Sequence, residues 1–197
     1  MYKRSLALLL VCLMILTLAF SGCSKPATET GSEAGGETAA PADEVIKVGW
    51  MGSLTGDQAV WGQCEFDTVK MLFEEINAKG GVLGGKKLEA IGYDTKGDPQ
   101  EAVNVAKRLT GQDKVVAIIG PNASGNAIPI APVLEEAKVP DIATVATNPK
   151  VTVLDGKVKP FNFRVCFIDP YQGAVAAGYA YDVLKFTKAA ILYDVAD

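Results

Sequence analysis

Histidine is absent from the 197 residues of this chain. The missing imidazole excludes Ser-His-Asp triads, histidine metal sites and imidazole acid–base catalysis. Clusters of lysine and arginine are lacking too: 19 basic residues are scattered among 23 acidic ones, and the formal net charge is −4. An acidic chain without a basic patch binds nucleic acid poorly. We therefore expect no nucleic-acid partner.

Cysteine is scarce, with four in the chain. Cys12 lies in an N-terminal apolar run and Cys23 lies just after it, which leaves Cys64 and Cys166 for the folded part. These two either form one disulfide in an oxidising compartment or remain free thiols. Spacing alone does not decide between the two, but we favour free thiols because the pair matches no motif.

The N-terminus has the pattern of a secretory signal peptide. Lys3 and Arg4 precede an apolar run at residues 6–20. The run is shorter than the roughly 20 residues that span a bilayer, and it fits the apolar region of a signal peptide. We therefore predict that residues 1–22 form a cleaved signal peptide. A true transmembrane anchor is the alternative.

The end of this segment, LAFSGC, resembles the lipobox of bacterial lipoproteins, although Phe20 stands where leucine is more usual. The resemblance implies cleavage before Cys23, a diacylglycerol thioether on its sulfur and acylation of the new N-terminus. Lipid chains of this total length hold a protein stably on a membrane. The other interpretation is an ordinary signal peptide followed by a chance cysteine.

Residues 24–44, SKPATETGSEAGGETAAPADE, contain no large apolar side chain. Such a segment cannot bury enough surface to offset the entropy lost on ordering. We predict that residues 23–44 are a flexible tether between lipid and domain. Cleavage removes Lys3 and Arg4 but no acid, so the formal net charge changes from −4 to −6.

From Val45 onward, β-rich runs alternate with helical patterns. The predicted strands are residues 45–52, 87–94, 115–120, 141–146, 161–167 and 189–194. The predicted helices contain the apolar stripe from Phe66 to Ile76, residues 98–112, a segment from near Ser124 to about Lys138, and residues 169–186. This alternation is typical of an α/β fold with a parallel sheet and right-handed crossovers.

Ligands of open parallel sheets bind beyond the carboxyl ends of the strands. The loops expected at those ends are residues 53–61, 93–98, 121–124, 145–149 and 167–171.

Two helix starts carry a capping pattern. Asp98 is the predicted N-cap, with Pro99 at the first helical position and Glu101 at the third. Residues 169–172 repeat the pattern, with Asp169 as the predicted N-cap. In a capping box, the cap side chain and the third helical residue satisfy each other's backbone N–H groups.

The segment IIGPNASGNAIP begins like a phosphate-binding loop. Gly120 and Gly125 have the GxxxxG spacing, but Asn126 and Ala127 stand where a phosphate loop carries Lys and Ser or Thr. A magnesium nucleotide is therefore not expected. The free N–H groups of a helix beginning near Ser124 still suit a small anion such as a carboxylate. Taken alone, Ser124 could equally be a plain N-cap.

Three segments in series now carry a resemblance to a known family. They are NAKGGVLGGKKLEAIGYDTKGDPQEAVNVAKRL, AIIGPNASGNAIPIAPVLEEAKVPDIATVAT and FNFRVCFIDPYQG. From about Val45 to Asp197 the chain resembles the branched-chain amino-acid type of periplasmic binding protein, the substrate-binding component of ABC importers.

The resemblance implies a type I periplasmic-binding-protein fold, in which two Rossmann-like lobes close on a ligand at a hinge. Family members are much longer than this sequence. We therefore expect lobe one at residues 45–165, and the hinge crossing with a truncated start of lobe two at residues 166–197.

The same resemblance implies a site for the α-amino-acid head group. The family serine at the position of Ser124 binds the α-carboxylate, and the threonine at Thr147 contributes its hydroxyl and N–H. The residue matching Val145 offers its backbone carbonyl to the ammonium. Without the resemblance, Thr147 is equally well explained as a turn residue before Asn148-Pro149.

Three further residues are implied less directly. Trp61 matches an aromatic, more often tyrosine, that packs on the ligand side chain; it could instead anchor a surface loop. Asp169 matches an acid that contacts the ammonium in some amino-acid-sensing relatives, a role compatible with capping. Tyr171 is its neighbour on the same loop.

The resemblance implies capture and delivery of an amino acid, not catalysis. The partners would be a membrane permease and its ATPase subunits, reached from a lipid anchor on the extracytoplasmic side of a bacterial membrane, and no cofactor is needed. The alternative is a sensing domain of the same fold that reports to a signalling partner. An enzyme on a Rossmann-like lobe is disfavoured, because no GxGxxG follows the first strand and histidine is absent.

Overall fold

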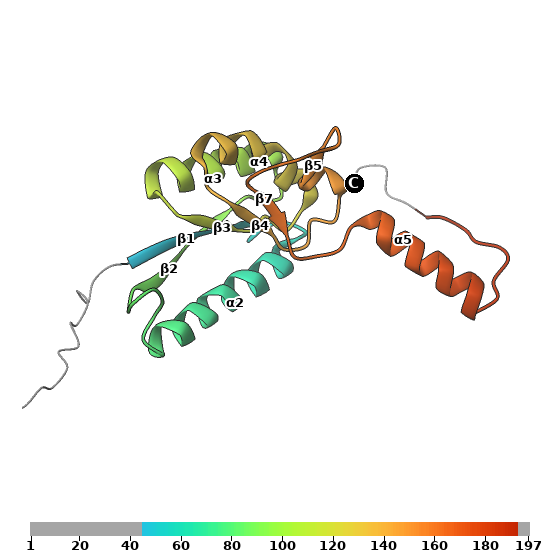
Figure 1. Ribbon diagram of the computed structural model, residues 1–197, viewed down its shortest axis with the longest axis horizontal. Helices are drawn as coiled ribbons and strands as arrows, with labels where there is room; N and C mark the ends of the chain where they lie inside the picture. The colour runs from blue at the N-terminus through green and yellow to red at the C-terminus, as the bar shows by residue number, and fades with distance from the viewer. Residues whose placement is uncertain (1–44, 193–197) are drawn as a thin grey trace, which may run out of the picture. The chain divides into compact units, whose positions relative to one another are not determined.

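A computed structural model describes residues 45–192, all of which belong to one structural unit (Figure 1). Its centre is a five-stranded parallel sheet with the order β2-β1-β3-β4-β7. The strands are β1 (Val45–Gly52), β2 (Lys87–Asp94), β3 (Ala117–Ile119), β4 (Asp141–Ala143) and β7 (Asn162–Arg164). The predicted α/β class with a parallel sheet is confirmed.

The described residues form four α-helices: α2 (Ala59–Ala78), α3 (Pro99–Arg108), α4 (Ser124–Ala137) and α5 (Asp169–Gly178). Figure 1 shows α2 on one face of the sheet, and α3 and α4 together on the other. A five-residue π-helical turn, Leu109–Asp113, prolongs α3. Among these helices, none has the length and apolar character needed to cross a membrane.

The strand order explains where a ligand can bind. After β1 the chain adds β2 on one side, and it then returns to place β3 on the other side of β1. The pair of neighbouring strands β1 and β3 therefore marks the topological switch point. The loops that follow these two strands diverge there and leave a crevice. The loops concerned are residues 53–58 and 120–123.

The core lies between the sheet and the α3–α4 layer. α3 buries Ala102, Val105 and Ala106, the i, i+3, i+4 spacing of one helix face, and Leu109 continues it. From the sheet and α4, Met51, Ile118, Ile130 and Leu134 complete the cluster. Full burial of each large apolar side chain contributes roughly 1.5–3 kcal/mol, so this layer is a rigid support for the switch point.

The first predicted capping pattern is confirmed in part. Asp98 is the N-cap of α3 and accepts a hydrogen bond of 2.7 Å from the Glu101 N–H. The reciprocal bond is not made, because the Asp98 N–H donates to the Thr95 carbonyl, while the Glu101 carboxylate accepts from Asn104.

The second predicted cap is wrong by one position. Ile168 occupies the N-cap of α5, and Asp169 is the first helical residue with no capping bond from its side chain. The N–H groups of Tyr171 and Gln172 both donate to the Ile168 carbonyl, so the helical ladder begins at Ile168. Asp169 therefore lies too far along to cap the first turn.

Three strands are shorter than predicted, and one is not formed in the described residues. Residues 189–192 have no strand conformation, and residues 193–194 lie outside the described part of the chain. An apolar run becomes a strand only where a neighbouring strand pairs with it, and no described strand pairs with this one. A short hairpin, β5 (Val153–Leu154) with β6 (Lys157–Val158), was not predicted.

The two folded-region cysteines, Cys64 and Cys166, are free thiols, as favoured from the sequence. The predicted signal peptide, the lipid-bearing Cys23 and the tether at residues 23–44 all lie outside the described residues.

Candidate ligand site

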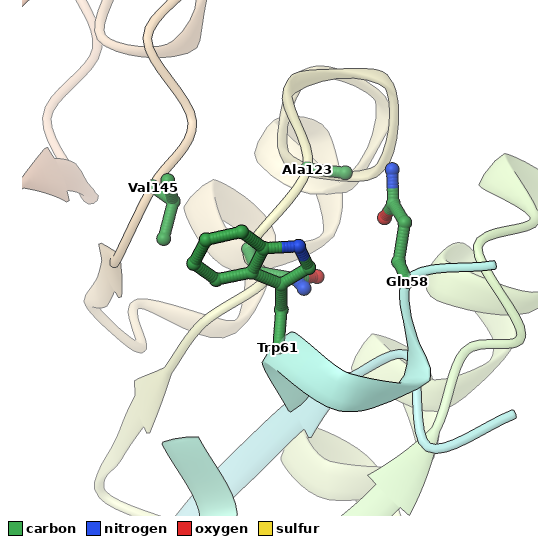
Figure 2. A pocket seen from close by; sticks show the side chains of 5 residues that line it. Gln58, Trp61, Ala123 and Val145 are labelled. Carbon is green, nitrogen blue, oxygen red and sulfur yellow. The ribbon is translucent and has the colours of Figure 1, made fainter. Parts of the chain in front are cut away.

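A cavity of about 180 Å³ lies at the switch point, beyond the carboxyl ends of β1 and β3. Figure 2 shows the Trp61 side chain rising from the first turn of α2 between Val145 and Gln58. The lining residues are Gln58, Trp61, Asn122, Ala123 and Val145. They come from the β1–α2 loop and helix start, the β3–α4 loop and the segment after β4.

Two large apolar side chains in the lining are exposed. Trp61 is 65% exposed and Val145 is 48% exposed. An exposed aromatic beside a hollow with a few polar groups is typical of a ligand or interaction site. The two side chains offer an apolar wall on each side of the cavity.

The β1–α2 loop is held by the carboxylate of Asp94 at the end of β2. It accepts hydrogen bonds from the Leu54 N–H at 2.8 Å, the Thr55 hydroxyl at 2.6 Å and the Lys96 N–H at 2.8 Å. Burial disfavours the charged form of Asp94, but these hydrogen bonds outweigh it and lower the pKa of the carboxyl. The loop that leads to Gln58 and Trp61 is thus tied to a second strand.

The start of α2 also lies unusually close to this loop. A Cβ added at Gly62 would lie only 2.0 Å from the backbone oxygen of Ser53, so glycine is required for this approach. Trp61 is the preceding residue, and its backbone is therefore placed by direct contact between helix and loop.

The β3–α4 loop supplies the opposite side of the cavity. Gly120 has a φ of +97°, and an added Cβ would lie 2.1 Å from the Met51 carbonyl oxygen. Behind the loop, the buried Asn126 amide donates to the Thr95 hydroxyl at 3.1 Å. The side-chain oxygen of Asn122, which lines the cavity, is buried and has no hydrogen-bond partner among the described residues.

α4 begins at this loop, and no described side chain caps its N-terminus. Its N-cap is Ala123, which offers no side-chain hydrogen bond. The first-turn N–H groups of Ser124 and Gly125 therefore have no intrahelical acceptor, and the positive end of the helix dipole lies beside the cavity. The interpretation of Ser124 as an N-cap is wrong, because it is the first helical residue.

Ser124 joins α4 to the loop after β4. Its hydroxyl oxygen accepts a hydrogen bond of 3.2 Å from the Asn148 N–H. Thr147 immediately precedes Asn148, and its carbonyl accepts from the Asp169 N–H at 3.2 Å. The structure therefore brings Ser124, Thr147 and the backbone of Asp169 to the same edge of the sheet, next to the segment that contains Val145.

Arg164 on β7 holds the segment on either side of Thr147. Its guanidinium donates to the carbonyls of Ala146 at 3.2 Å and Asn148 at 2.9 Å. It also donates to the Pro149 carbonyl and to the Thr152 hydroxyl, at 3.2 and 2.7 Å. Nothing in the local sequence distinguishes Arg164, because three of its four partners are backbone oxygens that the fold brings near.

Of the six residues predicted for ligand binding, Trp61 and Val145 line the cavity itself. Tyr171 is not brought to it within the described structure. Its ring lies 6.4 Å from that of Phe167, and both belong to a separate apolar hollow on α5. Gln58, Asn122 and Ala123 were not singled out, although the loops expected at the strand ends contain all three.

An open parallel α/β sheet with a cavity at its switch point defines the class of the chain: a lobe of the Rossmann-like type. A family model described as periplasmic binding protein matches residues 45–197. The chain belongs to the periplasmic binding protein family.

Similar proteins agree with this assignment. An amino acid binding protein of Pseudomonas aeruginosa is 38% identical over 170 residues, covering 85% of this chain and 43% of that protein. The leucine-specific-binding protein of Salmonella typhimurium is 34% identical over 149 residues, covering 76% of this chain and 39% of that protein. Both relatives are named binding proteins, not enzymes.

The solved structures include the branched-chain amino acid transporter substrate-binding protein of Streptococcus pneumoniae in complex with isoleucine. It is 32% identical with a TM-score of 0.66, and the match covers 72% of this chain and 39% of that one. The chain thus spans about two fifths of the length of the relatives that it matches.

Proposed function

We propose that this chain is the lobe-one part of a substrate-binding lipoprotein that captures an amino acid and delivers it to the permease of an ABC importer. The observation that carries the proposal is the exposed Trp61 over a cavity at the switch point, beside the uncapped start of α4. The relatives named as amino-acid binding proteins support the choice of ligand class.

The amino-acid head group would bind at the α4 edge. The Ser124 hydroxyl and the free first-turn N–H groups suit the α-carboxylate, and each such charge-assisted hydrogen bond contributes roughly 1.5–3 kcal/mol. The Thr147 hydroxyl and N–H add donors to the same group. The backbone carbonyl of Val145 would accept from the ammonium.

The ligand side chain would lie between the Trp61 ring and the Val145 side chain. Both are exposed in this lobe, so a bound apolar group would remove surface from water on both sides at roughly 25 cal/mol per Å². Asp169 and Tyr171, at the start of the second lobe, would approach the ligand when the lobes close by hinge bending.

The remaining parts of the chain fit the same role. We propose that residues 1–22 are a signal peptide, that Cys23 carries the lipid and that residues 23–44 tether the lobe. The lipid would keep the protein on the extracytoplasmic side of the membrane beside its permease. Residues 45–165 would form lobe one, and residues 166–197 would form the hinge crossing and the start of lobe two.

The test is a thermal-shift screen of the full-length protein from Asp43 onward, unfolded and refolded first to remove bound ligand. The panel holds the twenty amino acids, urea, short amides and aromatic acids. A ligand at about 1,000 times its Kd adds roughly 4 kcal/mol of stability. We expect a shift with aliphatic amino acids that is lost in Ser124→Ala and in Thr147→Val.

Thr68→Val is the matched control, because Thr68 is an exposed residue of α2 whose hydroxyl bonds only to its own helix. It should leave the ligand-induced shift unchanged. A ligand without a carboxylate as the only hit would contradict the role given to Ser124. No shift with any compound would contradict the proposed ligand class.

A further inference from the structure

Glu65 has a half-buried carboxyl group behind the cavity, and the proposed function does not use it. It lies on α2 four residues after Trp61, so the two side chains leave the same face of the helix. One carboxylate oxygen, Oε1, accepts a hydrogen bond of 2.8 Å from the Thr144 hydroxyl. Thr144 directly precedes Val145, the residue opposite Trp61 in the cavity.

The Glu65–Thr144 hydrogen bond therefore joins the two walls of the cavity. One wall stands on α2, and the other stands on the segment that follows β4. β3 lies between β1 and β4 in the sheet, so the walls do not belong to neighbouring strands. Among residues 45–192, no other hydrogen bond connects α2 with residues 144–148.

The second oxygen, Oε2, is buried and has no hydrogen-bond partner within the described part of the chain. Burial raises the pKa of Glu65, and the Thr144 bond opposes the shift only in part. Lys70, the one cation within α2, is paired with Asp67 at 2.8 Å. Arg164 on β7 is bonded to the oxygens around Thr147.

A carboxylate with one buried, unpartnered oxygen costs free energy. Its position between the two walls points to a role in holding them together. We propose that Glu65 is a positioning residue, a role that rests on the proposed function. The bond from Thr144 to Glu65 sets the spacing of Trp61 and Val145, and this spacing sets the affinity for the ligand.

The proposal predicts how affinity responds to substitution. L-leucine is the probe, and its Kd is measured by calorimetry on the full-length protein without lipid. Glu65→Ala and Thr144→Val should each weaken binding by about threefold to tenfold, the range for one lost hydrogen bond. The double variant should be no weaker than either single variant, because both remove the same bond. Thr144→Ser should retain the affinity.

A pH series separates positioning from simple packing. The ionised carboxylate makes the stronger, charge-assisted bond, so wild-type affinity should weaken as the pH falls from 7 through the raised pKa of Glu65. Glu65→Gln keeps the shape and a neutral acceptor. We expect it to show the wild-type low-pH affinity throughout and to lose this part of the pH dependence. Glu74→Gln, which removes an exposed acid farther along the same helix, is the matched control and should change neither quantity.

A second readout does not need a ligand. Trp61 is exposed and Trp50 is fully buried, so iodide should quench the fluorescence of Trp61 and not that of Trp50. The difference between the wild type and Trp61→Phe isolates the quenching of Trp61. Quenching should increase in Glu65→Ala and in Thr144→Val. Leucine binding with unchanged affinity in both variants would overturn the positioning role while leaving the proposed function intact. Absence of wild-type leucine binding together with altered quenching would overturn the proposed ligand and keep the link between the walls.

Discussion

Asp141 and Asn162 face each other across the neighbouring strands β4 and β7, and the Asn162 amide donates to the Asp141 carboxyl at 2.8 Å. Both residues are buried, and the second oxygen of Asp141 has no hydrogen-bond partner among the described residues. Burial raises the pKa of Asp141 to about 7, although the Asn162 bond, backbone N–H groups and the charge of Lys159 oppose the shift.

This pair predicts that the protein loses stability as the pH rises. The usual pKa of an aspartate is 3.8, so between about pH 4 and pH 7 the folded protein holds a proton that the unfolded chain has released. The contribution of Asp141 to the free energy of unfolding is complete below about pH 4. It decreases progressively as the pH rises from 4 through 7, and its size is a few kcal/mol. In Asp141→Asn, the urea midpoint should vary less with pH and should exceed that of the wild type at pH 8.

The control for this prediction is Asp155→Asn, an exposed aspartate in the β5–β6 turn. It should leave the pH profile of the urea midpoint unchanged. An Asp141→Asn profile parallel to that of the wild type would assign the pH dependence to other groups.

Arg164→Lys should weaken ligand binding without any contact to the ligand. Lysine cannot reproduce the planar guanidinium that binds the carbonyls of Ala146 and Asn148 together. Thr147 lies between these two carbonyls, so its hydroxyl and N–H should lose their position. We expect the Kd of the bound amino acid to increase by about tenfold, with a stability loss of roughly 1–3 kcal/mol.

Calorimetry and urea unfolding measure these two quantities. Arg108→Lys is the comparison, because Arg108 lies over the Tyr93 ring at 4.1 Å, on α3. It should change stability only slightly and leave the Kd unchanged. Equal affinities of the wild type and Arg164→Lys would remove Arg164 from the support of the site.

Gly62→Ala should destabilise the lobe strongly. The added Cβ would meet the Ser53 backbone oxygen at 2.0 Å, and a backbone atom cannot move aside as a flexible side chain can. We expect a loss of more than about 2 kcal/mol in the free energy of unfolding. Gly111→Ala is the control, because nothing lies within 4 Å of its added Cβ. Denaturant unfolding should show it neutral or up to about 1 kcal/mol more stable.

The apolar face of α5 should cause self-association of a chain limited to residues 45–192. Val175 and Tyr179 are 53% and 56% exposed, and together with Phe167 and Tyr171 they line one apolar hollow. Contiguous apolar surface of this kind promotes association. Light scattering after size exclusion should show concentration-dependent oligomers that decrease in Val175→Ser with Tyr179→Ser. Val158→Ser, an exposed but separate valine in the hairpin, should have no effect.

Much of the fold was predictable from local patterns. Asp98 with Pro99 marks the start of α3, and the apolar spacing of Ala102, Val105 and Ala106 marks its buried face. These features depend on neighbours within a turn, so a sequence pattern contains them. The cap of α5 was misplaced at Asp169 because the deciding event is which carbonyl begins the helical ladder, and Ile168 carries no sequence feature of a cap.

Some residues of the candidate site were likewise predictable from the sequence, and others were not. Ser124, Val145, Thr147 and Trp61 lie in or next to the loops at the strand ends, and local patterns together with the family resemblance suffice to propose them. Arg164 and Glu65 have no such signal, because each acts through partners distant in sequence or on backbone atoms.

The order of residues alone determined the alternation of strands and helices, the parallel sheet and the family, because hydrophobic periodicity and turn chemistry are local properties. Only the tertiary structure decided that Trp61 faces Val145 across a cavity, and that Glu65 and Thr144 connect the two walls. Strand order and close backbone approach, such as that at Gly62, set these relationships. They arise when the whole sheet packs, and no short stretch of sequence contains them.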